Sequence, residues 1–202
     1  YLREGRELCL VSQAEPEQEF RNIRRDVMRQ AYAAVALELL ERLVADRAPD
    51  PELFDRLRGT LSALDVEPES DLAAELWSFE LELADRLGYA PELGRCTSCG
   101  REASEGARFS VDAGGVVCAN CGAAPSDFGP DVVDVLRRLR AGVAPAELRD
   151  VSERLADDVG RALRELLEHH SGQRLNLRSQ PVLESLLRAE RSGPAGGRGR
   201  AF

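Results

Sequence analysis

The stretch 96-CTSCGREASEGARFSVDAGGVVCANCG-122 holds four of the five cysteines of this chain, in two C-x-x-C pairs separated by eighteen residues. Two residues between paired cysteines let the backbone fold back in a tight turn, so that both sulfurs reach one metal ion at about 2.3 Å. The spacing lies within the usual range for a four-thiolate zinc site. Cys96, Cys99, Cys118 and Cys121 are therefore the predicted ligands of one Zn²⁺ ion.

The residues between the two pairs predict a zinc ribbon. A glycine follows each pair, Gly100 and Gly122, which suits a turn with positive φ. The segment ARFSVDAGGVVC has the pattern of strand, Gly-Gly turn and strand, which carries the second pair up beside the first. Four protein thiolates complete a tetrahedral shell without an open position for water or substrate, so the predicted zinc is structural. An iron-bearing or redox use of the cysteines and a chance spacing are the alternatives.

On both sides of the ribbon, apolar residues recur at steps of three and four, which predicts amphipathic helices. Asp50 and Ser152 are typical first caps, and Gly88 and Gly172 are typical helix ends. The expected helices cover 20–45, 51–64, 71–87, 130–141 and 153–171, with a short strand at 6–11 and a last apolar patch at 181–187. The expected fold is mainly α: a helical bundle with an inserted four-cysteine zinc ribbon, preceded by a remnant of a β-domain.

The composition indicates a globular protein of one or two domains, with 43% hydrophobic and 31% charged residues. No apolar run reaches the ~18 residues of a membrane span and no signal-peptide pattern is present, so a cytoplasmic location without membrane contact is expected. The stretch YLREGRELCLVSQAE resembles the end of a β-structure, which we interpret as an N-terminal truncation. Cys9, in an apolar run, is expected to be a small buried hydrophobe.

The formal charge of -9 is unevenly distributed, because residues 31–170 carry fifteen Arg against twenty-eight acids. An acidic middle repels phosphate, so any DNA contact is expected on the flanks. On a helix from residue 20, Arg21, Arg25 and Arg29 share one face with Arg24 beside them, a row able to follow a DNA backbone. The alternative is that these are ordinary exposed arginines.

Enzyme signatures are missing: the chain has no Gly-rich phosphate loop, no G-x-S-x-G and no H-E-x-x-H. Asp157 and Asp158 are most simply a solvated helix face. His169 and His170 are adjacent on a helix and cannot easily face one metal together. The sequence therefore predicts a binding or scaffold protein, with no catalytic residues and no small-molecule substrate.

The segment ELWSFELELADRLGYAPELGRCTSCG combines a helix ending in Leu-Gly-Tyr with Pro, Leu and C-x-x-C-G, followed by Gly-Gly and a second C-x-x-C. This arrangement resembles the RecO family of bacterial DNA repair proteins. EFRNIRRDVMRQAYAAVALELLERL is similar to the start of that family's helical domain, and RLNLRSQPVLESLL is similar to its C-terminal Leu-Lys-Ser-Arg segment. The resemblance covers residues 1–187 and is most specific at 80–122.

The resemblance implies a recombination mediator of the RecF pathway that binds single- and double-stranded DNA, anneals strands and helps to load RecA. Its implied partners are RecR and the C-terminal tail of single-strand-binding protein, and its implied cellular location is the bacterial nucleoid. Of the family's N-terminal oligonucleotide-binding (OB-fold) barrel, only residues 7–12 are recognisable. The implied division is a barrel remnant at 1–18, helical domain at 19–95 and 123–187, zinc ribbon at 96–122 and disordered tail at 188–202.

The tail of single-strand-binding protein is acidic and ends in apolar residues, so its site needs a cation beside a hydrophobic groove. The expected helix at 153–171 offers both, with Arg154, Arg161 and Arg164 as candidate partner-binding residues. Solvated helix charge is the alternative for each of them. Two other functions stay open: a zinc-ribbon interaction module of the transcription or translation machinery, and a zinc-dependent enzyme with a partner-supplied ligand.

Overall fold

The computed structural model describes residues 2–4, 9–11, 13–44, 50–103, 105–122, 124 and 128–192, and for residues 2–4 and 9–11 it describes the backbone alone. Within these ranges the protein is mainly helical, as the sequence predicts. The helices are α1 (Val27–Val44), α2 (Pro51–Val66), α3 (Leu72–Arg86), α4 (Pro130–Arg140), α5 (Glu153–Ser171) and α6 (Ser179–Ser192). Short 3-10 helices are η1 (Glu69–Asp71), η2 (Ala119–Cys121) and η3 (Pro145–Leu148). No described helix has the length and apolarity needed to cross a membrane.

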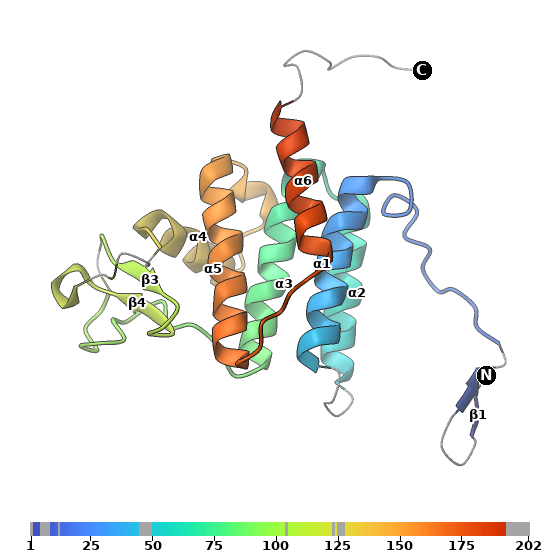
Figure 1. Ribbon diagram of the computed structural model, residues 1–202, viewed down its shortest axis with the longest axis horizontal. Helices are drawn as coiled ribbons and strands as arrows, with labels where there is room; N and C mark the ends of the chain where they lie inside the picture. Colours follow the sequence, from blue (N-terminus) through green and yellow to red (C-terminus); the bar gives the residue numbers. More distant parts are fainter. Residues whose placement is uncertain are drawn as a thin grey trace.

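Helix α3 is the centre of the bundle and packs against α1, α2, α4 and α5 (Figure 1). Its apolar stripe, Leu72, Leu76, Phe79 and Leu83, is at most 3% exposed, as its helical spacing predicts. Helix α6 lies along α1 on the outside of the bundle, and its only fully buried side chain is Leu183. Helix α6 is therefore a peripheral helix of the bundle.

The predicted helix boundaries are confirmed where a cap fixes them. Asp50 accepts a hydrogen bond from the Leu53 N–H at 3.0 Å at the start of α2. Ser152 accepts one from the Leu155 N–H at 3.4 Å at the start of α5. Gly172 closes α5 with φ of 67°, a conformation that favours glycine.

The predicted start of the first helix at residue 20 is wrong, because α1 begins at Val27. Phe20 has φ of 45°, which is incompatible with a helix, and residues 21–25 form turns. Asp65 on α2 accepts hydrogen bonds from the backbone N–H groups of Asn22 and Ile23, at 2.8 and 2.9 Å. These bonds hold the segment as a turn, and Asp26 then caps α1 by accepting from the Arg29 N–H at 2.9 Å.

The two ends of the described chain also differ from the expectation. The predicted strand at 6–11 corresponds to β2 (Cys9–Val11), which pairs antiparallel with β1 (Leu2–Glu4) in a hairpin away from the bundle (Figure 1). The Cys9 side chain lies outside the described part. The tail predicted from residue 188 begins too early, because α6 continues to Ser192. The rest of that tail, 193–202, lies outside the described residues.

An ion pair with a buried carboxylate joins segments that are far apart in the sequence. Asp71, just before α3, accepts two hydrogen bonds from Arg149, at 2.5 and 2.6 Å. The Asp71 side chain is 1% exposed, whereas that of Arg149 is 47% exposed. The hydrogen bonds from Arg149 lower the pKa of Asp71. The pair holds η3 and the chain before α5 against the start of α3.

Replacing Arg149 with Ala should lower the free energy of unfolding at pH 7 by about 2–3 kcal/mol, because it leaves the buried Asp71 carboxylate without its partner. Since the folded-state pKa of Asp71 is depressed, the pair stabilises the fold above the ordinary Asp pKa of about 3.9 and loses that effect at lower pH. The two proteins should therefore converge in urea unfolding as the pH falls below that value. Arg58→Ala, which removes an exposed pair with Asp55, should cost under about 0.5 kcal/mol. Equal effects of the two variants at pH 7 would contradict this prediction.

Candidate metal centre and binding cleft

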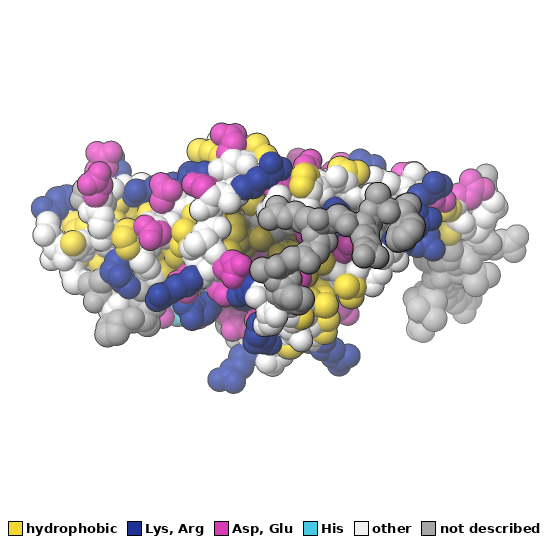
Figure 2. Space-filling model, turned by 90° about the horizontal axis from the view of Figure 1, so that it is seen from above, with side chains coloured by type: hydrophobic (Ala, Val, Ile, Leu, Met, Phe, Trp, Pro, Cys, Tyr) yellow, Lys and Arg dark blue, Asp and Glu magenta, His cyan; other side chains and the backbone are white. Residues whose placement is uncertain are grey.

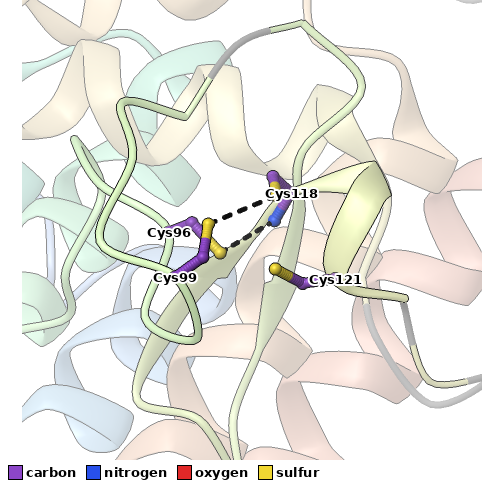
Figure 3. A group of neighbouring side chains, drawn as sticks. All are labelled: Cys96, Cys99, Cys118 and Cys121. Atoms are coloured by element: carbon purple, nitrogen blue, oxygen red, sulfur yellow. Dashed lines mark hydrogen bonds between the residues drawn. The ribbon is translucent and has the colours of Figure 1, made fainter.

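The four predicted cysteines converge at one end of the ribbon (Figure 3). Their sulfur atoms all lie within 4.8 Å of one another, and Cys99 Sγ is 3.8 Å from Cys118 Sγ. Sulfurs bound tetrahedrally to one zinc ion at about 2.3 Å are themselves about 3.8 Å apart. Cys96 and Cys118 are buried, and Cys99 and Cys121 face solvent. The donor set and its spacing therefore fit a single four-thiolate metal centre.

The local backbone turns each cysteine pair toward the same point. The Cys96 N–H donates to Arg101 O at 2.8 Å, and the Gly100 N–H donates to Cys96 O at 2.8 Å, which closes the first turn. In the second turn the Cys121 N–H donates to Cys118 O at 3.0 Å. Gly100 and Gly122 have φ of 72° and 80°, the positive values that their positions in the sequence predict.

The surroundings of this centre shift the pKa values of three of its thiols, two downward and one upward. The Cys118 N–H donates to Cys96 Sγ at 3.3 Å, and this bond, with others from neighbouring backbone N–H groups, lowers the pKa of Cys96 to about 6. A hydrogen bond from the Arg101 side chain lowers the pKa of Cys99. Its sulfur neighbours, Cys99 first, raise the pKa of Cys121 to about 12. Four negative sulfurs this close repel one another, so the fully ionised cluster needs a cation.

The ribbon itself is the small antiparallel sheet that the sequence predicts, β3 (Arg108–Ser110) and β4 (Gly115–Val117), with Phe109 opposite Val116. Both of these side chains are fully buried and belong to the same core as the helices. Gly115 is required because a Cβ atom there would collide with the Glu92 backbone.

Helix α4 fastens the ribbon from the other side. The Arg137 guanidinium donates to Leu93 O at 2.9 Å and to Ala103 O at 3.1 Å, one carbonyl on each side of the first cysteine pair. Phe128, just before α4, exchanges backbone hydrogen bonds with Phe109 at 2.8 and 3.0 Å. The metal centre is thus held against the bundle by the core and by α4.

The two histidines lie apart from the cysteines, at the opposite end of the ribbon. His169 Nδ1 is 3.5 Å from Asp112 Oδ1 in the β3–β4 turn. The His170 ring stacks on Tyr89 with centroids 5.7 Å apart and lies against Gly114. Within the described ranges, the four-cysteine cluster is the one grouping of three or more His, Cys, Asp or Glu side chains that could hold a metal ion. The histidines are therefore packing residues between the ribbon and α5.

A cleft of about 600 Å³ opens between α3, α5 and α6, with Tyr32 of α1 at one side. Its apolar lining includes Leu76, Trp77, Leu183 and Leu187. On the face in Figure 2, hydrophobic side chains are visible in the middle of the molecule among acidic and basic ones. Neither periodicity nor motif predicts this cleft, because its walls come from four helices spread over more than 150 residues.

The structure separates the three predicted partner-binding arginines. Arg164 lines the cleft, and no hydrogen bond or ion pair ties its guanidinium to another described residue. Arg161 also lines the cleft, but it donates to Asp158 at 2.5 Å and stacks over the Phe128 ring at 5.2 Å. Arg154 is exposed on α5 and is not part of the cleft lining.

The predicted arginine row on the first helix does not exist as a row. Arg21, Arg24 and Arg25 lie in the turns before α1, and Arg21 pairs with Glu19 at 2.6 Å. Arg29 is on α1, but its guanidinium donates to Leu64 O at 2.5 Å and to Glu67 O at 2.8 Å. Its side chain therefore caps the C-terminal end of α2 and is engaged within the protein.

Comparison with known proteins agrees with this architecture. The family model described as "Recombination protein O C terminal" matches residues 24–179, which include helices α1 to α5 and the metal centre. A DNA repair protein RecO of Alkaliphilus metalliredigens is 41% identical over 120 residues, 59% of this chain and 48% of that protein. RecO proteins of Symbiobacterium thermophilum and Anaeromyxobacter dehalogenans are 34% and 36% identical over 92% and 87% of this chain, and over 75% and 70% of their own lengths.

The chain thus spans between about half and three quarters of the length of these relatives. The matches extend across both halves of the bundle and the ribbon between them. By the extent of the family match and the similarity to these relatives, the chain belongs to the RecO family of DNA repair proteins.

Proposed function

We propose that this chain is the helical and metal-binding part of a recombination mediator, which binds DNA and partner proteins to promote strand annealing and RecA loading in the RecF pathway. The observation that carries the proposal is the match of the RecO family over residues 24–179 on a fold that presents a cleft and a metal centre but contains no catalytic motif among the residues described. This assignment favours DNA repair over a ribbon module of transcription or translation. RecR and single-strand-binding protein are the proposed partners, at the bacterial nucleoid.

The proposed organisation is a helical domain, 19–95 and 123–192, with the ribbon 96–122 inserted between its two parts. Phe109 and Val116 of the ribbon share one continuous core with α3, α4 and α5, which supports an insertion within one domain. Residues 1–18, with the β1–β2 hairpin, are the proposed remnant of an OB-fold domain.

The cysteine cluster is a structural Zn²⁺ site in this proposal. Four sulfur donors with no fifth His, Asp or Glu in the described cluster match the closed shell of a structural zinc site. A closed shell argues against a zinc-dependent hydrolytic reaction, so the proposed role is non-enzymatic. The metal would fix the two turns that the C-x-x-C pairs form at one end of the ribbon.

Purified chain should therefore contain about one zinc ion, and Cys99→Ser should lose it, since three thiolates bind zinc far more weakly than four. The melting temperature should fall by roughly 10 °C, because metal binding contributes to the free energy of folding. Elemental mass spectrometry and thermal unfolding measure the two effects. Cys9→Ser, outside the cluster, is the matched control and should retain the metal. Unchanged zinc content and melting temperature in Cys99→Ser would rule out the metal centre.

The cleft between α3, α5 and α6 is the proposed site for the tail of single-strand-binding protein. It combines apolar walls with Arg164, which has no ion-pair partner among the described residues, and such a tail offers acidic residues and apolar ends. We therefore propose the cleft, rather than a helix face, as the partner site, and Arg154, which does not line the cleft, is not part of this proposal.

A labelled tail peptide should bind Arg164→Ala about 10- to 100-fold more weakly than the unchanged chain, the effect of losing a charge-assisted hydrogen bond. Fluorescence anisotropy measures the affinities. Arg154→Ala, an exposed arginine of the same helix, should stay within about twofold of the unchanged chain. Equal affinity for all three proteins would move the partner site elsewhere.

DNA contact by this part of the protein is proposed for Arg21, Arg24 and Arg25, in the turns before α1. Arg24 and Arg25 form no ion pair with described residues, whereas the bonds of Arg29 to α2 argue against a role for it in DNA contact. On the face in Figure 2, basic and acidic side chains are interspersed and form no continuous basic surface. The proposed contact is therefore small and without base specificity.

Three phosphate contacts predict a slope of about -2 for log affinity against log salt on single-stranded DNA. Glu at positions 21, 24 and 25 together should abolish binding at low salt, as a filter-binding titration would show. A charge-matched variant with Glu at exposed positions 58, 95 and 154 should keep most of it. If both variants lose binding equally, net charge and not this turn governs the interaction.

A further inference from the structure

A carboxyl group is buried beneath the cleft without a partner. Glu80 of α3 is 0% exposed, and neither of its oxygens has a hydrogen-bond partner among the residues that the structure describes. Burial raises the pKa of Glu80 to about 7, and the charge of Arg164 offsets part of that rise. An unpartnered carboxylate in a protein interior is costly, so this group calls for an explanation beyond packing.

Glu80 is placed to act on the wall of the cleft. It lies one helical turn after Leu76 and Trp77, two residues of the cleft lining, on the same helix. Helices α3 and α5 come close together at Gly160, where a Cβ atom would lie 3.4 Å from Trp77 Nε1 and 3.1 Å from Arg164 Nη1. The Arg164 guanidinium and the Trp77 indole therefore both lie beside Gly160, close to the turn of α3 that carries Glu80.

Arg164 differs in its contacts from the other cations of the cleft. Arg191 is engaged by Asp157 at 2.8 and 2.9 Å and by Glu153 at 3.3 Å, and Arg161 by Asp158. Arg164 has no such surface partner within the described residues, and among these residues it is the charged group that acts on Glu80. The charge of Glu80 therefore changes how much positive charge Arg164 offers to a ligand, beside the charge of Asp157, whose carboxylate also acts on Arg164.

The other titratable groups of the cleft come from three helices. On α6, Glu190 has its pKa raised by burial and by Glu69, and on α1 Tyr32 has its pKa raised above the ordinary range, so it stays neutral near pH 7. Asp157 has its pKa lowered by Arg191, so it stays ionised there. The remaining charged groups of the lining are Glu153 and Arg161 on α5 and Glu184, Arg188 and Arg191 on α6.

We propose that Glu80 is a positioning residue that couples peptide binding in the cleft to its own protonation. When Glu80 is neutral, Arg164 is free to bind the terminal carboxylate of an acidic peptide with apolar C-terminal side chains. When Glu80 is ionised, its negative charge offsets the charge of Arg164, and the peptide carboxylate is bound more weakly. Peptide binding then takes up a proton near neutral pH. The inference rests on the proposed peptide-binding role of the cleft and adds the means by which it is regulated.

The direction and size of the pH effect on peptide affinity follow from the titration of Glu80 near pH 7. If only chains with a protonated Glu80 bind the peptide, the fraction of such chains falls from about 0.9 at pH 6 to about 0.1 at pH 8. The apparent affinity for the peptide then falls about tenfold. A peptide without histidine keeps its own acidic groups ionised between pH 6 and pH 8, so its own titration does not change the affinity over this range.

The experiment is fluorescence anisotropy with such a peptide at pH 6 and pH 8, on the chain and on Glu80→Gln. The chain should show the tenfold loss, and Glu80→Gln should bind with nearly the same affinity at both pH values. Glu190→Gln, which removes the other cleft carboxyl with a raised pKa, should keep the tenfold slope whatever its affinity. A peptide with an amidated C-terminus should bind weakly and without the slope.

Isothermal titration calorimetry of peptide binding to the unsubstituted chain provides a test that needs no variant. At pH 7.5, the binding enthalpies in two buffers of different ionisation enthalpy should differ by the amount expected for net proton uptake. Binding that is equal at pH 6 and pH 8, or a slope that persists in Glu80→Gln, would overturn the role of Glu80 and leave the cleft as a peptide site. No binding at either pH would overturn the proposed peptide site, and the inference with it.

Discussion

The continuous core between the ribbon and the helices is the constraint on which the rest of the structure depends. Phe109 belongs to a ribbon strand, yet it is fully buried in the same apolar cluster as α3, α4 and α5. The helices cannot complete that cluster alone, and the short strands β3 and β4 are too small to be stable without it. Folding of the bundle and formation of the cysteine site are therefore linked through this one packing contact.

The sequence predicts those parts of the fold that depend on neighbouring residues, and it does not predict those that depend on distant ones. The cysteine spacing, the caps Asp50 and Ser152 and the terminal Gly172 each depend on residues within a few positions of one another, and the structure shows the predicted turns and helix ends. The start of α1 could not be predicted in this way, because Asp65 fixes it from more than forty residues away. The ion pair of Asp71 could not be predicted for the same reason, since its partner Arg149 is seventy-eight residues distant.

In the candidate sites too, the sequence does not predict which distant residues contact a charged side chain. A helical pattern tells which face an arginine occupies, but not whether a carbonyl or carboxylate from another element engages its guanidinium. Arg29 and Arg161 were expected at interfaces, and the structure engages the first with the end of α2 and the second with Asp158 and Phe128. The arginine that stays available, Arg164, is distinguished only by the three-dimensional structure of the cleft.

Helix α3 connects the two sites that these arguments identify. Its middle carries Trp77 and Glu80 beneath the cleft, and its end leads through Gly88 and Tyr89 to Cys96 at the metal centre. Arg137 and the Phe109 packing hold the ribbon to the same bundle whose helices α3 and α5 form walls of the cleft. Helix α3 is therefore a shared support of the cleft and of the segment that carries the first cysteine pair.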